Sequence, residues 1–348
     1  MPAIEQTRIN IPNRVWLTLT GMCNNQCVWC FRRGSESNKF LDLNLIRSAT
    51  KTLVNCGTRF CTLTGGEPTL HPQFELIIKE LTADGMFSSC IVITNARKFA
   101  YSVPDEIAKN KRVHVTASIH GADSQHYQSN TGVPEGFYQA VTGIKNLVAA
   151  GIRCSASIVL GPENLGRIED FISLTARLGI ETLCFTIGIP SLDNPTYNTN
   201  PLAVANAIPA IASLCENVGQ KYCFVLSLPW CLLEKEFLEK MFKSEKIMFN
   251  CPVPGGNSIV IKENGAIALC THTTGYELAS PEEAKVVLSN PESFRNFWGS
   301  QTIRNLRATI DVFRHNRCLS CQYRWWCRGG CPLWWQFYDF SEVISQRS

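Results

Sequence analysis

The sequence has no apolar run long enough to cross a membrane. Its longest apolar stretch, Cys223 to Leu233, is interrupted by Pro229 and is about half of the ~20 residues that a membrane helix needs. The N-terminus lacks an apolar core behind a basic start, so we expect no signal peptide and no membrane partner. Together these absences predict a cytoplasmic protein.

The chain also has little excess of positive or negative charge. The formal net charge is only +4, from 33 Lys and Arg against 29 Asp and Glu, so we expect no nucleic-acid partner. Apolar residues make up 45% and charged residues 18% of the 348 residues, which excludes the disordered classes.

Short β-rich runs alternate with segments of helical periodicity over the first half of the chain. The runs that predict strands are Arg14–Thr20, Phe60–Thr64, Cys90–Thr94, Arg112–Ile119, Arg153–Leu160 and Glu181–Ile187. The segments that predict helices between them include Leu43–Cys56, Phe74–Ala83, Phe137–Ala150 and Leu165–Leu178. Six β–α repeats indicate a parallel sheet, open or curled, and we predict an α/β fold with a partial (β/α)6 TIM-like barrel. Ligands of such sheets bind at the C-terminal ends of the strands.

The alternation of predicted strands and helices stops in the last third of the sequence. Asn264-Gly265 is a hairpin turn signal between two short apolar runs, and a tail rich in Cys and Trp follows. We therefore predict a barrel domain over residues 1–222, a bridging segment over 223–250, and a small cysteine-rich domain with a β-hairpin over 251–348.

Seventeen cysteines are an unusual number for a chain of this kind. Seven of them fall into two tight groups, at positions 23, 27 and 30 and at positions 318, 321, 327 and 331. In a reducing compartment, clustered thiols predict metal ligands rather than disulfides.

The first group has the spacing C-x3-C-x2-C directly after the first predicted strand. Cys23, Cys27 and Cys30 are one thiolate short of the four that close a [4Fe–4S] cluster. An iron without a protein ligand is open to substrate, as in catalytic zinc sites that keep one open position. A zinc site with a fourth ligand elsewhere is the alternative.

A second pattern, Gly65-Gly66-Glu67-Pro68, follows the second predicted strand. Paired glycines allow close approach of the backbone to a ligand, and a carboxylate accepts hydrogen bonds from an ammonium group. Together with the cysteine loop, this pattern resembles the radical S-adenosylmethionine (radical SAM) superfamily over roughly residues 12–190.

The resemblance implies a set of cofactor contacts. Cys23, Cys27 and Cys30 would hold a [4Fe–4S] cluster whose open iron binds the amino and carboxylate groups of S-adenosylmethionine. The methionyl amino group would be contacted by Gly65, Gly66 and Glu67, with Pro68 setting the turn. The remaining cofactor contacts implied by the resemblance are Trp29 near the adenine and Asn95 and Ser118 at strand ends. Asn95 and Ser118 could instead cap their strands.

The resemblance also implies the chemistry. An electron, delivered by a flavodoxin- or ferredoxin-type donor, cleaves S-adenosylmethionine, and the resulting 5′-deoxyadenosyl radical removes a hydrogen atom from substrate. The protein supplies orientation and excludes water. His120, at the end of the fourth predicted strand, is a candidate base or an ordinary core histidine.

The second group of cysteines resembles the C-terminal SPASM extension of radical SAM enzymes, with six of its seven cysteines present. The resemblance implies one auxiliary [4Fe–4S] cluster on Cys251, Cys270 and Cys331, whose fourth ligand could be Cys231. It implies a second auxiliary cluster on Cys318, Cys321 and Cys327. No cysteine follows Cys331, so the second cluster would have an open iron or a ligand such as Asp339, or be degenerate. A structural zinc on the last four cysteines is the alternative.

Three functions remain open at this point. The first is a radical SAM enzyme acting on a peptide or protein, by crosslinking, thioether formation or side-chain oxidation, with a separate protein presenting the peptide. The second is the same chemistry on a small metabolite. The third is a non-catalytic iron–sulfur or zinc scaffold or electron carrier, against which the Gly65-Gly66-Glu67 loop argues.

Overall fold

The computed structural model of the chain describes most of the sequence. The described residues are 10–33, 37–190, 194, 197, 199–248, 251–273, 275–310 and 315–345.

Within these residues, eleven strands form one sheet in the order β11-β10-β9-β1-β2-β3-β4-β5-β6-β7-β8. The strands are β1 (Arg14–Thr18), β2 (Phe60–Thr64), β3 (Ser89–Thr94), β4 (Val113–Ser118), β5 (Cys154–Leu160), β6 (Thr182–Ile187), β7 (Lys221–Val225), β8 (Ile247–Met248), β9 (Ser258–Ile261), β10 (Ile267–Ala268) and β11 (Glu277–Ala279). Neighbouring strands from β9 through β1 to β8 pair in parallel, whereas β10 pairs antiparallel with β9 and β11.

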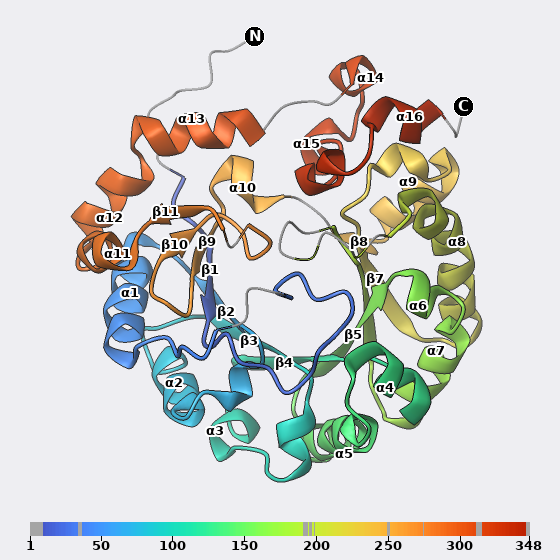
Figure 1. The fold of residues 1–348 in the computed structure, drawn as a ribbon, viewed down its shortest axis with the longest axis horizontal. Helices are drawn as coiled ribbons and strands as arrows, with labels where there is room; N and C mark the ends of the chain where they lie inside the picture. Colours follow the sequence, from blue (N-terminus) through green and yellow to red (C-terminus); the bar gives the residue numbers. More distant parts are fainter. Residues whose placement is uncertain are drawn as a thin grey trace.

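Helices surround the curved sheet on its outer side (Figure 1). Those that belong to the barrel are α1 (Leu43–Cys56), α2 (Phe74–Leu81), α3 (Asp105–Ala108), α4 (Ser124–Thr131), α5 (Gly136–Ala149), α6 (Pro162–Leu165), α7 (Ile168–Arg177), α8 (Pro201–Asn217) and α9 (Lys235–Lys243). Those of the C-terminal part are α10 (Pro252–Gly255), α11 (Pro281–Val287), α12 (Pro291–Trp298), α13 (Gln301–Ile310), α14 (Asn316–Leu319), α15 (Arg324–Cys327) and α16 (Phe340–Ser345). Short 3-10 helices are η1 (Pro68–Leu70), η2 (Arg97–Ala100), η3 (Trp230–Leu232) and η4 (Pro332–Gln336).

Local sequence explains the regular elements. On β4 and β6, fully buried residues alternate with half-buried ones, because one face packs under helices and the other faces the barrel interior. Helix α1 begins where the Asp42 side chain accepts the N–H of Leu45 and ends at Gly57, whose φ of 113° suits glycine.

The predicted fold class is confirmed: the chain is an α/β protein whose parallel strands form a partial barrel. The predicted helix Leu165–Leu178 begins later, at Ile168, after the separate short helix α6. The predicted hairpin is present as β9 and β10, with Gly265 in its turn at a φ of 91°.

The C-terminal hairpin continues the barrel sheet, because β9 pairs with β1 in register Arg14↔Ser258. The sheet therefore runs across the predicted boundary at residue 251, and the domain limits stay a prediction. Among the described residues, no helix combines the length and apolar character needed to span a bilayer.

Candidate active site

The first cysteine group occupies the loop after β1. Cys23 is exposed, whereas Cys27 and Cys30 are half-buried. Two backbone N–H groups of this loop donate to carbonyl oxygens near the end of α4 at 2.9 and 3.0 Å. The loop is thereby held over the C-terminal end of the barrel, as sequence reasoning places it.

The three thiols lie close enough to influence one another. Although Cys23 is exposed as a residue, surrounding atoms desolvate its thiol, and this desolvation, with the nearby charges of Glu67 and Cys30, raises the pKa of Cys23 to about 12. Burial, with Cys30 and Cys23, also raises the pKa of Cys27. Each thiolate repels the negative charge of the next, so the three thiols lose their protons more readily when a cation is bound between them. This donor set fits an iron–sulfur cluster, which takes thiolate ligands.

No group of three or more His, Cys, Asp or Glu side chains within the described ranges has the geometry to hold a single metal ion. This finding concerns one ion only. In a [4Fe–4S] cluster each thiolate binds a different iron, so the sulfur atoms stand farther apart.

Gly65 and Gly66 bring the loop after β2 against the cysteine loop. The N–H of Gly66 donates to the Thr20 carbonyl at 2.8 Å. A Cβ on Gly65 would lie 2.4 Å from the Thr20 oxygen, and a Cβ on Gly66 would lie 2.1 Å from the Met22 oxygen. Only glycine allows this approach, so the two loops that sequence analysis linked do meet.

The Glu67 carboxylate is buried and accepts four hydrogen bonds. Its Oε1 accepts from the N–H and hydroxyl of Thr69, at 3.2 and 2.6 Å, and from the Thr94 hydroxyl at 2.7 Å. Its Oε2 accepts from the N–H of Asn95 at 2.8 Å. Burial raises the pKa of Glu67. The carboxylate therefore ties the end of β3 to the glycine loop, and its predicted contact with an ammonium group stays a prediction.

Asn95 connects this loop to the cysteine loop. Its amide donates to the Asn24 side chain at 2.6 Å. The Arg97 guanidinium donates to the backbone oxygen of Asn24 and to the side chain of Asn25, the latter at 2.9 Å. Sequence analysis missed Asn24, Asn25 and Arg97, whose only local signal is their position beside predicted residues.

His120 and Trp29 form an aromatic wall beside the cysteine loop. The Nδ1 atom of His120 lies 3.8 Å from the sulfur of Cys27, and its ring lies 5.7 Å from that of Trp29. Burial lowers the pKa of His120 to about 4, so its imidazole is neutral near pH 7. Both side chains are buried. The adenine contact of Trp29 and the role of His120 as a base stay predictions.

Ser118 is half-buried at the end of β4, opposite Ser157 of β5. Its predicted contact with S-adenosylmethionine stays a prediction.

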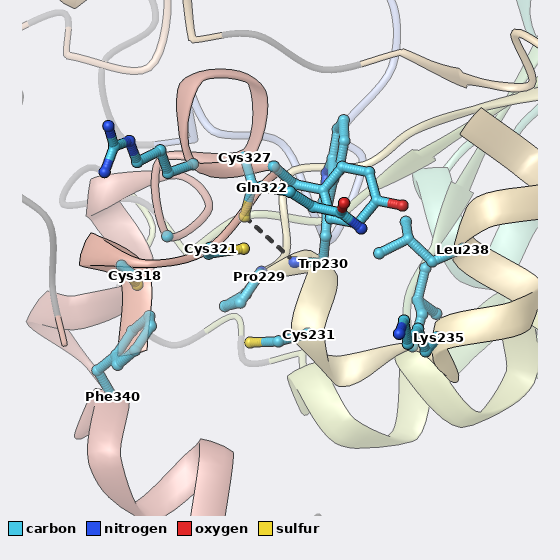
Figure 2. A pocket seen from close by; sticks show the side chains of 14 residues that line it. Pro229, Trp230, Cys231, Lys235, Leu238, Cys318, Cys321, Gln322, Cys327 and Phe340 are labelled. Atoms are coloured by element: carbon cyan, nitrogen blue, oxygen red, sulfur yellow. Dashed lines mark hydrogen bonds between the residues drawn. The ribbon is translucent and has the colours of Figure 1, made fainter. Parts of the chain in front are cut away.

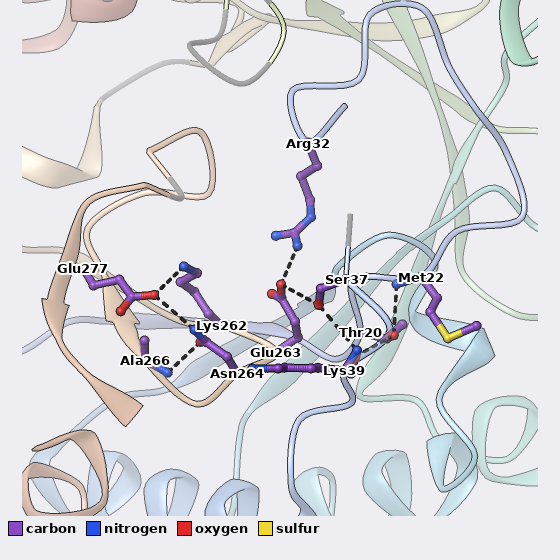
Figure 3. A network of polar contacts seen from close by, with 10 residues as sticks. All are labelled: Thr20, Met22, Arg32, Ser37, Lys39, Lys262, Glu263, Asn264, Ala266 and Glu277. Carbon is purple, nitrogen blue, oxygen red and sulfur yellow. Dashed lines mark hydrogen bonds and ion pairs between the residues drawn. The ribbon is translucent and has the colours of Figure 1, made fainter. Parts of the chain in front are cut away.

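A buried ion pair joins the cysteine loop to the C-terminal hairpin (Figure 3). The Arg32 guanidinium lies 2.7 Å from the Glu263 carboxylate, with side chains 5% and 6% exposed. The Ser37 hydroxyl donates to the same carboxylate oxygen at 3.2 Å. The cysteine loop is thus clasped by residues more than 200 positions away in the sequence.

The second cysteine group is divided between two places. Cys251 precedes α10, and half-buried Cys270 follows β10. Cys318, Cys321 and Cys327 line a cavity, and Cys231 of η3 lines the same cavity. Sequence analysis paired Cys231 with Cys251, Cys270 and Cys331 instead. Asp339 caps α16, its Oδ1 accepting the N–H of Glu342 at 2.9 Å. All seventeen cysteines lie in the described ranges, and none forms a disulfide.

A family model described as the radical SAM superfamily matches residues 17–175. The match supports a radical SAM domain over these residues, and such a domain implies a [4Fe–4S] cluster and S-adenosylmethionine. The match includes every predicted residue of the first cofactor site and none of the C-terminal cysteines.

The curated relatives are named for a small-molecule reaction. A probable GTP 3′,8-cyclase of Sulfurisphaera tokodaii is 28% identical over 169 residues, which are 48% of this chain and 53% of that protein. The GTP 3′,8-cyclase of Pasteurella multocida is 31% identical over 142 residues, which are 39% of this chain and 41% of that protein. The chain spans about half the length of the curated relatives it matches.

Solved structures resemble the fold over nearly the whole chain. Streptococcus suis SuiB bound to S-adenosylmethionine has a TM-score of 0.72 at 14% identity, covering 93% of this chain and 74% of that one. Native anSMEcpe with bound AdoMet and the Kp18Cys peptide has a TM-score of 0.67 at 13% identity, covering 96% and 97%. The similarity of fold therefore includes the C-terminal part.

Proposed function

We propose that the chain is a radical SAM enzyme that cleaves S-adenosylmethionine reductively and removes a hydrogen atom from a peptide or protein substrate. The observation that carries the proposal is the docking of the Gly65-Gly66 loop on the three-cysteine loop. When bound, the cluster and S-adenosylmethionine supply the electron and the 5′-deoxyadenosyl radical. The product would be a crosslinked, thioether-bridged or oxidised peptide.

The residues of the chain hold and shield the cofactors in this proposal. Cys23, Cys27 and Cys30 bind iron, and the half-buried backbone of Gly65 and Gly66 lies beside them, where its carbonyl groups accept the methionyl ammonium. The buried Glu67 carboxylate keeps that loop in place. Trp29, His120 and Ser118 close the site around adenine and ribose and keep water away.

The inner face of strands β4 to β6 favours a neutral substrate. Helices cover the outer face of the sheet (Figure 1). The fully buried alternate side chains of β4 to β6 pack under these helices, so we infer that the half-buried ones face inward. These include Thr116, Ser118, Ser157 and Thr186. A nucleoside triphosphate requires several cationic side chains, whereas a peptide segment is bound by hydroxyls and backbone groups. The likeness of the whole fold to SuiB and anSMEcpe, both solved with peptides, supports the same choice.

A small-molecule substrate is the second candidate, favoured by the relatives named GTP 3′,8-cyclase. In both candidates we propose auxiliary iron–sulfur clusters in the C-terminal part and a flavodoxin- or ferredoxin-type electron donor. A separate protein would present a peptide substrate. Seventeen thiols without a disulfide suit a reducing compartment, in accordance with a cytoplasmic location.

Release of 5′-deoxyadenosine tests the first step. Anaerobically reconstituted and reduced protein should form it slowly from S-adenosylmethionine alone, and Cys27→Ala should abolish the release. The matched control is Cys56→Ala, which removes a half-buried thiol from α1 and should leave the release unchanged. Absence of release from the wild type would refute the proposal and support the scaffold alternative. Full release from Cys27→Ala would refute the assignment of Cys27 to the cluster.

Substrate class is tested separately by adding GTP or a peptide encoded in a short reading frame next to the gene. We expect the peptide to raise 5′-deoxyadenosine formation and to change mass by loss of two hydrogens. GTP should have no effect. A new nucleotide product, formed only with GTP, would favour the small-molecule candidate.

A further inference from the structure

One cavity of the molecule is walled by cysteines from two distant parts of the chain. It measures about 280 Å³ and lies between the segment after β7 and the C-terminal helices (Figure 2). Its cysteines are Cys231, Cys318, Cys321 and Cys327. A single zinc ion with sulfur ligands at about 2.3 Å needs far less room, so the cavity suits a group of several atoms.

The segment after β7 and the C-terminal helices, which form the two walls of the cavity, are fixed to each other by backbone contacts. The N–H of Trp230 donates to the Cys327 sulfur at 3.3 Å, as Figure 2 shows. The N–H of Cys331 donates to the Ser227 oxygen at 2.7 Å. Gly330 has a φ of 80°, and a Cβ there would lie 2.7 Å from the same oxygen. Cys231, next to Trp230, is therefore held opposite the C-terminal cysteines by the fold itself.

Charges around the cavity agree with a negatively charged occupant. Four thiolates around a [4Fe–4S]²⁺ core leave two negative charges. The cationic side chains of Lys235 and Arg324 line the same cavity and offset these charges.

We propose that Cys231 is the fourth ligand of an auxiliary [4Fe–4S] cluster held by Cys318, Cys321 and Cys327. Each thiol gives up its proton when its sulfur binds iron. All four irons then have a cysteine ligand, so this cluster has no open position for a substrate thiolate or amine. Its role is to pass electrons and to fasten the C-terminal part to the barrel.

This assignment leaves Asp339 outside the cluster. Its carboxylate already caps α16, whereas Cys231 stands in the cavity wall. The proposal does not rest on cleavage of S-adenosylmethionine, since the cavity is separate from the first cysteine loop.

The test uses the full chain with Cys23, Cys27 and Cys30 changed to Ala, so that all remaining iron belongs to the C-terminal part. After anaerobic reconstitution, we compare this parent with versions that also carry Cys231→Ala, Asp339→Asn or Cys154→Ala. Iron and sulfide are measured, and electron paramagnetic resonance is recorded on the oxidised protein. Circular dichroism of each apoprotein checks folding.

We expect Cys231→Ala to lose about four irons per chain relative to the parent, or to lose one iron and gain the signal of an oxidised [3Fe–4S] cluster. Asp339→Asn and the thiol control Cys154→Ala should match the parent. Cys231→Ser offers an oxygen ligand in the same place and should retain iron with an altered spectrum.

Three results would overturn the assignment. They are a Cys231→Ala protein with the iron and spectrum of the parent, loss of iron in Asp339→Asn instead, and a parent that binds zinc at this site in place of iron. None of these measurements involves turnover, so failure of the assignment is distinct from failure of the proposed enzyme activity.

Discussion

At the scale of single residues, Glu67 is the side chain on which the geometry of the first site depends. In Glu67→Gln, the amide group can take the place of Oε2 and face the N–H of Asn95, so that two donors meet in a buried place. An unsatisfied buried donor costs about 1–3 kcal/mol. We expect urea denaturation to show this loss in the free energy of unfolding. The rate of 5′-deoxyadenosine release should fall about tenfold for each ~1.4 kcal/mol by which the activation free energy rises. Glu75→Gln, on the exposed face of α2, should change neither quantity.

Gly66 offers a sharper steric test. Gly66→Ala places a methyl group 2.1 Å from the Met22 oxygen, so one loop must move. We expect a loss of about 1–3 kcal/mol in the free energy of unfolding, together with loss of 5′-deoxyadenosine release. The matched control is Gly166→Ala, where nothing lies within 4 Å of the new Cβ. Equal behaviour of the two variants would show that the loops do not dock as described.

The sequence predicts the residues of this site better than their contacts. Spacing within one loop is a local property, so Cys23, Cys27 and Cys30 and the paired glycines could be found. The four donors to Glu67 come from Thr69 in η1 and from Thr94 and Asn95 at the end of β3, and their arrangement depends on the register of β2 and β3. The place of Cys231 is harder still to predict, since its neighbour Trp230 meets Cys327 across 97 positions and spacing gives no sign of that contact.

At the scale of elements, periodicity predicts the barrel almost completely because each β–α unit is local. The helix Leu43–Cys56 is found with the predicted bounds, and each of the six predicted strands is present. In the C-terminal part, α12 and α13 are separate helices that meet at Gly299 and Ser300. The parallel pairing of β9 with β1 is long-range, so no local pattern indicates it.

Glu216 joins three neighbouring elements and gives a prediction of pH dependence. The Tyr222 hydroxyl, Lys240 and Lys246 donate to its carboxylate and lower the pKa of Glu216 to about 2, from 4.5. The carboxylate therefore stabilises α8 against β7 and α9 above pH 4.5, and this contribution is lost as the pH falls toward 2. Because the side chain is one-third exposed, we expect it to be worth less than about 1 kcal/mol.

Denaturation of Glu216→Gln at several pH values checks this contribution. The variant should be less stable than the wild type at about pH 7, and the difference should shrink below about pH 5. Glu169→Gln, at an exposed position of α7, should show no such trend. A difference that grows on acidification would contradict the assigned network.

At the scale of the whole molecule, the barrel and the C-terminal part are joined at two places. At the first, β9 pairs with β1, and the Arg32–Glu263 ion pair adds a contact between the cysteine loop and the hairpin. At the second, Cys231 and the C-terminal cysteines line one cavity. With a cluster in that cavity and the ion pair beside the first cysteines, the binding of a cluster by the barrel or by the C-terminal part would depend on the folding of the other part.

The Arg32–Glu263 pair tests this coupling. Arg32→Met leaves the Glu263 carboxylate buried without its cation, and breaking a buried pair costs roughly 3–5 kcal/mol. The double variant Arg32→Met/Glu263→Leu removes both charges and should recover most of that loss. Arg47→Met, which breaks the exposed pair with Glu80, serves as control and should have little effect. Because Arg32 follows Cys30 by two positions, iron retention at the first site should fall in Arg32→Met and return in the double variant. Equal losses in the single and double variants would mean that the pair does not couple the two parts, and that the hairpin is held by the sheet alone.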